Sequence, residues 1–443
     1  MLRAGRGEYA SIKGDADEGG AVTLNALEPI VDLRLQGDTE VSVEKNKKSL
    51  GVVGSGAPPK VLFLDGIRGL AAMLVVLQHS NEYMNDINVG ASAVDAFFVL
   101  SSFLLTMLFL KKAERLLAQG ASYRKWAFTL ADYFLKRFFR VYPCFALLAV
   151  LLWLLPFEYQ NRFFLVETAD KYDLYKVLTF DIEHRYLMLW TLPLEIVYYF
   201  FIPTFVLATA RMRRFWWVAF TPLHIWVLYD GFYTYRSHHT LLRPHFTTFL
   251  QGSMAAVIFV KIDTWRRDTG FEFSKWQVVA IRATEYATIT LLVSECFRAL
   301  LYEWVHENFV PIPPGDSFIS MLLASIIVIE MVLPSSVSTT LEWNVLRHWG
   351  KISFSVYLLH PFVIFSETIR QKNNYYDRYF GRLLLLHLVA TMSYYVVEYP
   401  LQMVVRRLSW QLAQVEKKGG GALVYSTVNA ATEPRRSSIA DCV

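Results

Sequence analysis

The chain has 443 residues, of which 54% are hydrophobic and 15% aromatic, and its mean hydropathy is +0.30. This composition excludes an ordinary soluble globular protein and indicates an integral membrane protein. The formal net charge of +5 does not indicate a nucleic-acid partner, because Lys and Arg gather at the ends of apolar segments, where they orient a membrane protein. We therefore expect the lipid bilayer, and no nucleic acid, as a partner.

Ten apolar segments are predicted to cross the bilayer as helices. Each approaches the roughly 20 residues that one crossing needs, and none shows the alternating pattern of a barrel strand. The predicted fold is therefore all-α, a polytopic bundle of about ten transmembrane helices. The predicted spans are 61–79, 93–110, 142–157, 186–209, 214–232, 245–262, 277–293, 316–333, 352–369 and 382–405.

Polar tails flank the predicted membrane domain, residues 58–409. Residues 1–57 are rich in Gly and charge and lack an apolar signal region, so we expect a disordered cytoplasmic tail. Residues 410–443 are predicted to form a second such tail. Basic residues are dense in the predicted internal linker 111–140 and absent from the first external linker, 81–93, so both termini are expected in the cytoplasm of an endomembrane or plasma membrane protein.

The first span, VLFLDGIRGLAAMLVVLQHS, contains Arg68 and His79. These residues are eleven apart, which puts them on one helix face, about 16.5 Å apart along the axis. Ionisable groups at membrane depth are costly and are often functional. An imidazole near the outer end of the span can act as a general base toward a hydroxyl, although a histidine there is also common as a polar rim residue.

Arg137 and Arg140, in KRFFRVYP, are predicted at the same cytoplasmic level as Arg68. Because a guanidinium fork binds phosphate oxygens bidentately, these arginines could hold a phosphorylated cytosolic cofactor. The alternative is that Arg137 and Arg140 only anchor the third span at the interface.

Three carboxylates lie close enough to these groups to act on them. Asp95 and Glu195 are predicted at a depth from which either could orient the histidine, although Asp95 is also a candidate N-cap. Glu195 lies deep in its span and needs a partner or a watery cavity. Asp65 is expected to pair with Arg68, three residues along the same helix face.

His360, in ISFSVYLLHP, lies in mid-span and is followed by Pro361. Since proline lacks an N–H, it frees a backbone carbonyl that can line a cavity. His360 is therefore a candidate for contact with substrate, and packing is the alternative. No metal site is expected, because Cys144, Cys296 and Cys442 are far apart and form no ligand motif.

Seven sequence motifs follow one another in the order seen in a known family. Residues 60–405 resemble the acyltransferase 3 family, membrane enzymes that transfer acyl groups from acyl-coenzyme A to hydroxyls. The motifs are LDGIRGLAAMLVVLQH, VDAFFVLSSFLLT, KRFFRVYP, LWTLPLE, FLQGSMAA, GKISFSVYLLHP and VEYP.

The resemblance implies His79 as catalytic base, with Arg68, Arg137 and Arg140 on the acyl-donor side and Glu195 as the carboxylate of the fourth span. We add Asp95 as a catalytic candidate and Ser101 and His360 as substrate-pocket candidates. The candidate residues are therefore His79, Glu195 and Asp95 for catalysis, Arg68, Arg137 and Arg140 for binding of acyl-CoA, and Ser101 and His360 for the substrate pocket. The implied co-substrate is acyl-CoA, most simply acetyl-CoA, and the acceptor a carbohydrate, lipid or small metabolite.

Two positions depart from the family pattern. Ser102 stands where the family usually has the glycine of Ser-Gly-Phe, and Pro193 stands where a serine is common. Because glycine allows the closest helix approach, we expect looser packing at Ser102.

One alternative function belongs to a different class. Arg68, His79, Asp95 and Glu195 could form the proton relay of a proton-coupled transporter. Such a protein would move its substrate without forming a covalent product.

Overall fold

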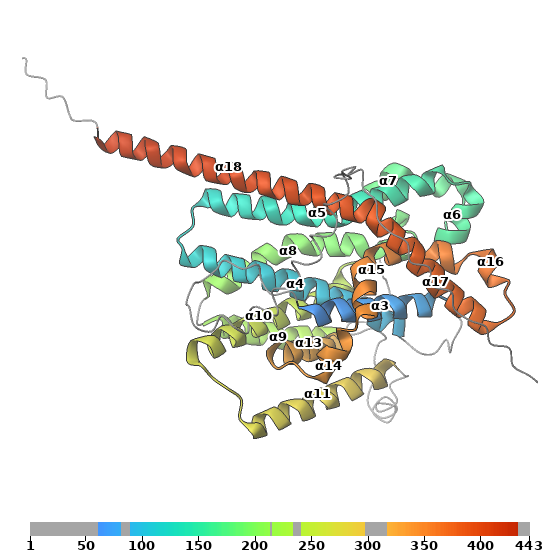
Figure 1. Ribbon diagram of the computed structural model, residues 1–443, viewed down its shortest axis with the longest axis horizontal. Helices are drawn as coiled ribbons and strands as arrows, with labels where there is room; N and C mark the ends of the chain where they lie inside the picture. The colour runs from blue at the N-terminus through green and yellow to red at the C-terminus, as the bar shows by residue number, and fades with distance from the viewer. Residues whose placement is uncertain (1–60, 81–88, 213–214, 234–240, 297–316, 433–443) are drawn as a thin grey trace, which may run out of the picture. The chain divides into compact units, whose positions relative to one another are not determined.

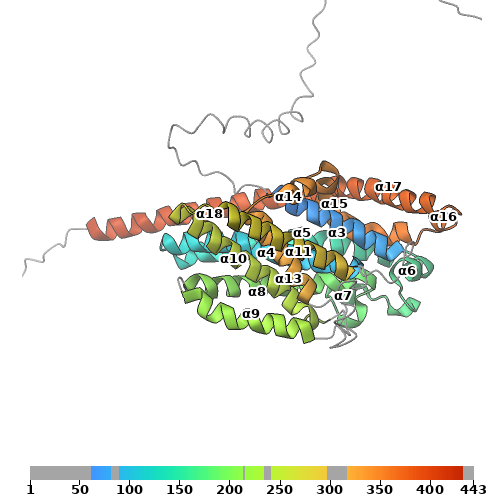
Figure 2. The same ribbon diagram turned by 90° about the horizontal axis from the view of Figure 1, so that it is seen from below.

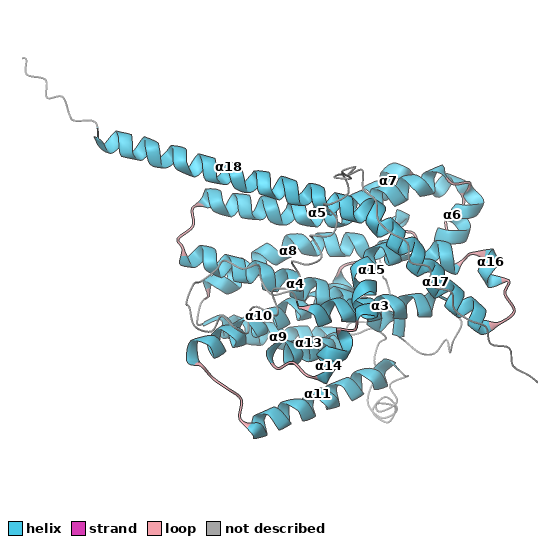
Figure 3. Ribbon diagram, viewed as in Figure 1, coloured by secondary structure: helices cyan, strands magenta, loops and turns pink. Residues whose placement is uncertain are grey.

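The protein is described by a computed structural model that covers residues 61–80, 89–212, 215–233, 241–296 and 317–432. These residues contain helices and no strand, as Figure 3 shows. The predicted tail 1–57 lies outside the described residues.

The described residues form a series of α-helices along the chain. They are α3 (Leu62–Ser80), α4 (Val89–Ala118), α5 (Tyr123–Leu154), α6 (Phe157–Phe164), α7 (Leu174–Leu178), α8 (Thr191–Arg211), α9 (Trp216–Tyr233), α10 (Phe246–Thr269), α11 (Lys275–Cys296), α13 (Ser317–Val332), α14 (Ser336–Leu341), α15 (Asn344–Ile364), α16 (Glu367–Arg370), α17 (Tyr375–Ser393) and α18 (Tyr399–Thr432), and a π-helical turn, Tyr394–Glu398, joins α17 to α18 (Figure 1).

Each predicted span overlaps a helix of the structure, although 142–157 runs past the end of α5, 352–369 runs past the end of α15 into α16, and 382–405 runs from α17 through the π-helical turn into α18. Within the described residues, six helical stretches are long and apolar enough to cross a membrane, and α13 is a shorter apolar helix. The chain is therefore an all-α, multi-pass membrane protein. The six stretches are Leu62–Ser80, Val89–Ala118, Tyr123–Leu154, Leu187–Arg211, Arg243–Thr269 and Tyr375–Lys418.

Several helices extend well beyond the apolar segments from which the spans were predicted. Helix α5 begins at Tyr123, after the N-cap Ser122, whereas its span was predicted from residue 142. The predicted linker 111–140 is therefore mostly helical. The predicted domain boundary at residue 409 falls inside α18. Hydropathy identifies the part of a helix that suits the bilayer, while backbone hydrogen bonding and caps decide where the helix ends.

Helix α3 lies between α4 and α15 (Figures 1 and 2). On its arginine-bearing half, α3 meets α14 and α15 backbone to backbone. A Cβ atom at Gly66 would overlap the carbonyl oxygen of Leu341, and one at Gly350 would overlap the carbonyl oxygen of Asp65. Small residues allow this kind of close approach between membrane helices.

Helix α4 packs against α10, also at very short range. The Ser102 side chain is fully buried and donates to the carbonyls of Phe98 and Val99 within its own helix. Gly252 of α10 faces it, and a Cβ there would overlap the Ser102 hydroxyl. The expected loosening at Ser102 is therefore wrong, because the glycine that permits close approach is on the opposite helix.

Candidate active site

The His79 ring is stacked on the His360 ring. The centroids are 5.1 Å apart and the planes differ by 23°. His79 lies in the last turn of α3, and His360 lies near the end of α15, which packs along α3. The two histidines, one predicted as a base and one as a pocket residue, therefore form one imidazole pair.

His360 has a defined tautomer. Its Nδ1 lies 2.8 Å from the carbonyl oxygen of Tyr357, the carbonyl that Pro361 leaves without its usual helical donor. Because a carbonyl only accepts, Nδ1 carries the proton and Nε2 is left as an acceptor. His360 is 1% exposed, and within the described residues its Nε2 has no hydrogen-bond partner.

Polar contacts tie the histidine pair to the start of α8. The Tyr357 hydroxyl lies 2.8 Å from the Thr191 hydroxyl and donates to the carbonyl of Met188. Tyr357 and Thr191 were not singled out from the sequence. Tyr357 stands in the same motif as His360, so the signal that could have found it is its place one turn before a histidine in mid-span.

Ser101 and Glu195 form a second contact between predicted site residues. The Ser101 hydroxyl donates to Glu195 Oε1 at 2.5 Å and so links α4 to α8. Glu195 also hydrogen bonds the Tyr199 side chain, one turn further along α8. The partner that a deep carboxylate requires is therefore a pair of hydroxyls.

The structure gathers the three predicted phosphate-binding arginines. Arg68 is paired with Asp65 at 3.2 Å, as predicted, and its charge interacts with those of Arg140 and Glu195. Arg137 and Arg140 lie in the middle of α5, where Arg137 interacts electrostatically with Tyr199. Arg68 of α3 thus interacts with Glu195 and with Arg140 of α5, and Arg137 and Arg140 interact with Tyr199, a hydroxyl partner of Glu195.

Arg137 and Arg140 form no direct ion pair with a described residue. Within the part of the chain that the structure describes, Arg137 and Arg140 have no carboxylate within ion-pair distance, and Arg137 Nε is buried without a hydrogen-bond partner. Cationic forks that protein groups leave unsatisfied are suited to bind an anion. The geometry therefore fits a phosphorylated ligand.

Glu398 joins this cluster through the π-helical turn. It is almost fully buried, accepts a hydrogen bond from Ser355 of α15, and interacts electrostatically with Arg140. Single π-turns are rare and are frequent at functional sites. Glu398 belongs to the motif VEYP but was not among the predicted site residues, although a glutamate in a predicted span is a signal that could have identified it.

Asp95 lies inside a helix and not at its start. It is the seventh residue of α4, which begins at Val89, so the N-cap alternative is wrong. The residue is 0% exposed. Neither Asp95 nor Glu195 hydrogen bonds or ion pairs with His79 in the described structure, and the neighbour of His79 is a second histidine.

The site therefore has two levels on α3. Arginines and Glu195 lie at one level, and imidazoles lie about 16.5 Å along the helix at the other, a separation that follows from eleven helical residues. The cationic groups and the imidazoles thus lie at different positions along α3 and are not combined at one point. Among the described residues, no group of three or more His, Cys, Asp or Glu side chains could hold a metal ion.

Comparison with known proteins identifies the family. The chain is 24% identical over 371 residues to YrhL of Bacillus subtilis (strain 168), provisionally named a peptidoglycan O-acetyltransferase, and this match covers 76% of the chain and 54% of YrhL. It is 22% identical over 394 residues to SAR0937 of Staphylococcus aureus (strain MRSA252), provisionally named an O-acetyltransferase, a match that covers 80% of the chain and 59% of that protein.

The chain thus spans little more than half the length of these curated relatives. No solved structure matches it. Residues 61–397 match the family model described as an acyltransferase domain, and this match covers most of the chain and both levels of the site. The chain belongs to this family, the acyltransferase 3 family.

Proposed function

We propose that the protein is a membrane O-acyltransferase that moves an acyl group from acyl-CoA to an acceptor hydroxyl. The observation that carries the proposal is the two-level site, with an arginine cluster at one level of α3 and an imidazole pair at the other. Family membership and the names of the relatives support acyl transfer.

The arginine level suits the phosphates of coenzyme A. Arg137 and Arg140 are cationic groups without ion-pair partners in the described structure, and Arg68 lies beside them. Bidentate guanidinium contacts bind phosphate strongly and position it. The pantetheine arm is long and unbranched, so it can bridge from this level toward the histidines.

The histidine level suits proton transfer. In the proposed reaction, His79 takes the proton of the acceptor hydroxyl while the oxygen of that hydroxyl attacks the carbonyl carbon of the thioester. The new C–O bond forms, the C–S bond breaks, and the proton goes to the departing thiolate, which leaves as coenzyme A. His360 keeps one face of the His79 ring covered, and its own Nδ1 proton is committed to the Tyr357 carbonyl.

Glu195 and Asp95 have different places in this proposal. Glu195, held by Ser101, supplies a negative charge among three arginines and limits their mutual repulsion. Asp95 is fully buried within α4, and we assign no step of the reaction to it.

The acyl group is most simply acetyl, because both relatives are named for O-acetylation. We propose a carbohydrate, lipid or small-metabolite hydroxyl as acceptor, in a plasma or internal membrane with both termini in the cytoplasm. The clustering of Lys and Arg in segments such as 111–140 supports this orientation.

The transporter alternative receives less support. A proton relay needs neighbouring groups that exchange hydrogen bonds, yet His79 contacts His360, Glu195 contacts Ser101, and Arg68 contacts Asp65. Of the four residues of the predicted relay, Arg68 and Glu195 interact electrostatically, while the described ring partner of His79 is His360, which is outside the relay.

The test uses purified protein in nanodiscs with radiolabelled acetyl-CoA. We expect wild type to bind acetyl-CoA and to release free coenzyme A, Arg68→Ala to bind acetyl-CoA about tenfold more weakly, and His79→Ala to bind normally but lose ~100-fold or more of the release rate. Gly381→Ala is a matched control, because a Cβ there meets no atom within 4 Å. Folded wild-type protein that binds no acetyl-CoA would contradict the proposal and favour transport.

A further inference from the structure

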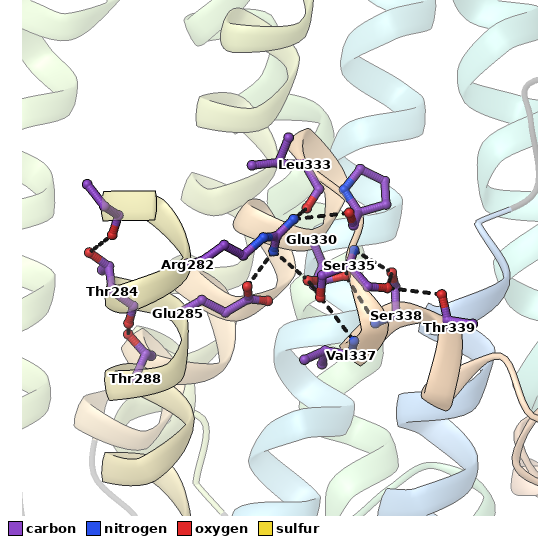
Figure 4. A network of polar contacts seen from close by, with 12 residues as sticks. Arg282, Thr284, Glu285, Thr288, Glu330, Leu333, Ser335, Val337, Ser338 and Thr339 are labelled. Atoms are coloured by element: carbon purple, nitrogen blue, oxygen red, sulfur yellow. Dashed lines mark hydrogen bonds and ion pairs between the residues drawn. The ribbon is translucent and has the colours of Figure 1, made fainter. Parts of the chain in front are cut away.

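A second buried charge cluster lies away from the two-level site, where α11, α13 and α14 meet. Arg282 of α11 forms ion pairs with Glu285 of its own helix and with Glu330 of α13, the latter at 3.1 Å (Figure 4). The Glu285 and Glu330 side chains are both 0% exposed. Burying these charges is costly, so their retention requires a reason beyond simple stability.

The Glu330 carboxylate binds the first residues of α14. Its Oε2 accepts from the backbone N–H groups of Ser335 and Ser338, at 3.0 and 3.1 Å, and its Oε1 accepts from the Ser335 hydroxyl at 2.5 Å (Figure 4). These are donors that a helix N-terminus leaves without intrahelical partners. This carboxylate on α13 therefore adds to the capping box that Ser335 and Ser338 form at the start of α14.

Arg282 fixes the connection between α13 and α14. Its Nη2 donates to the carbonyls of Leu333 and Pro334, which separate the two helices, while Nη1 holds the Glu330 carboxylate (Figure 4). All the described contacts of this guanidinium go either to a carboxylate or to the first two residues of the connector 333–335. The ion cluster thus controls the position of α14 as a unit.

The far end of α14 rests on the arginine-bearing half of α3. The Leu341 carbonyl occupies the space where a Cβ of Gly66 would lie, and the Leu346 carbonyl of α15 does the same at Gly69. Arg68 lies between these two glycines. Because backbone meets backbone here, a displacement of α14 cannot be absorbed by a side-chain rotation and must move the α3 backbone.

We infer that Glu330, oriented by Arg282, is a positioning residue for Arg68 and thereby for the phosphates of acyl-CoA. This inference rests on the proposed function. The carboxylate helps to fix the start of α14, α14 fixes the first turns of α3, and those turns carry the guanidinium. Glu330 touches neither substrate nor the histidine pair, so it acts on donor binding and leaves the chemical step unchanged.

The first experiment measures acetyl-CoA binding and turnover of Glu330→Gln in nanodiscs. We expect the dissociation constant to rise about tenfold and the rate at saturating acetyl-CoA to change less than about twofold. Glu114→Gln is the matched control, since Glu114 forms a 2.7 Å ion pair with Lys261 between α4 and α10, away from α14, and should leave both quantities unchanged.

Coupling to Arg68 separates positioning from general damage. In an Arg68→Ala background, we expect Glu330→Gln to cause no further loss of binding, because the group through which it acts is already absent. Equal losses of affinity in the presence and absence of Arg68 would overturn the inference, as would a fall in the saturated rate with unchanged affinity.

A second measurement does not depend on acyl-CoA. Hydrogen exchange should become faster in 335–343 and in 62–69 when Glu330 is changed to Gln, and protection that stays at the wild-type level in both segments would overturn the inference. If Glu330→Gln does not fold, Ser335→Ala is the milder variant, because it removes the hydroxyl contact to Glu330 together with the N-cap contact to the Val337 N–H and keeps the ion cluster. Wild type that binds no acetyl-CoA would contradict the proposed function alone, and the exchange measurement would still decide whether Glu330 holds α14 and α3.

Discussion

The two ends of α3 are built in opposite ways. At the Arg68 end, Gly66 and Gly69 bring backbone against backbone, so the guanidinium stands on a turn that cannot shift by itself. At the His79 end, contacts are made by side chains: the His79 ring lies on His360, and Gln78 accepts from the Gly90 N–H at 3.2 Å.

This difference matches what each level is proposed to do. A phosphate-binding fork needs fixed geometry, because bidentate hydrogen bonds weaken steeply when their angles change. A base that meets successive ligands needs a ring that can adjust, and side-chain contacts permit rotation. Four predictions test this comparison between a rigid anion level and an adjustable proton level.

The largest expected effect is at the arginine level. Replacing both Arg137 and Arg140 by Ala should raise the dissociation constant for acetyl-CoA ~100-fold, because each charged hydrogen-bonding group contributes at least 1.5 kcal/mol by a rough average. Binding titrations at low salt measure it. The corresponding double Lys variant should recover only part of the affinity, since an ammonium cannot bind phosphate bidentately. Full recovery would show that charge alone matters and that geometric rigidity does not.

The next effect compares three glycines. Gly66→Ala should destabilise the protein by ~2–3 kcal/mol, because the new methyl group would meet the Leu341 backbone. Gly90→Ala should cost less, because its Cβ would lie 2.5 Å from Gln78 Cγ and 2.7 Å from Gln78 Cβ, a smaller overlap than the one with the Leu341 carbonyl oxygen at Gly66. Thermal unfolding in detergent measures both, with Gly381→Ala as the control that meets nothing. Equal losses at Gly66 and Gly90 would contradict the contrast between the two ends.

A moderate effect is expected at the imidazole pair. His360→Asn should keep a donor for the Tyr357 carbonyl but remove the ring stacked on His79, and we expect the acyl-transfer rate to fall about tenfold. Acetyl-CoA affinity should be unchanged, because His360 lies at the other level. Steady-state rates and binding constants separate the two quantities, and a loss of affinity alone would assign His360 to the donor site.

The smallest effect is expected at Ser101. Removing its hydroxyl in Ser101→Ala leaves Glu195 with Tyr199 as a hydroxyl partner, so acetyl-CoA affinity should fall only about two- to threefold. The measurement is the same titration as for the arginines. Ser102→Ala is the control at the neighbouring position, because the Ser102 hydroxyl donates only to the Phe98 and Val99 carbonyls of its own helix. A larger loss at Ser102 than at Ser101 would place the determinant at the α4–α10 contact.

Local periodicity explains what could be predicted. The existence and approximate positions of the helices follow from apolar runs of sufficient length, and the pairing of Asp65 with Arg68 follows from a spacing of three on one helix. Helix ends were less accurate, as at α5, because polar residues continue a helix as well as apolar ones do. The same reason turned Asp95 from a possible cap into an internal, buried residue.

Contacts between distant segments required the tertiary structure. His360 was a candidate from its proline neighbour, but its stacking on His79 joins residues that lie at opposite ends of the sequence. Glu398 reaches Ser355 only because one π-turn interrupts the regular helix, and no local pattern marks such a turn.

The sequence by itself determined that this is a helical membrane protein with a cation and an imidazole on one helix, since helix rise and bilayer thickness are general physical constants. The tertiary structure decided which groups face each other across helices: a histidine beside His79, hydroxyls at Glu195, and a carboxylate of α13 at the start of α14. Such contacts depend on how several helices pack against one another. That packing is determined by many backbone and side-chain contacts between segments, and no single segment determines it.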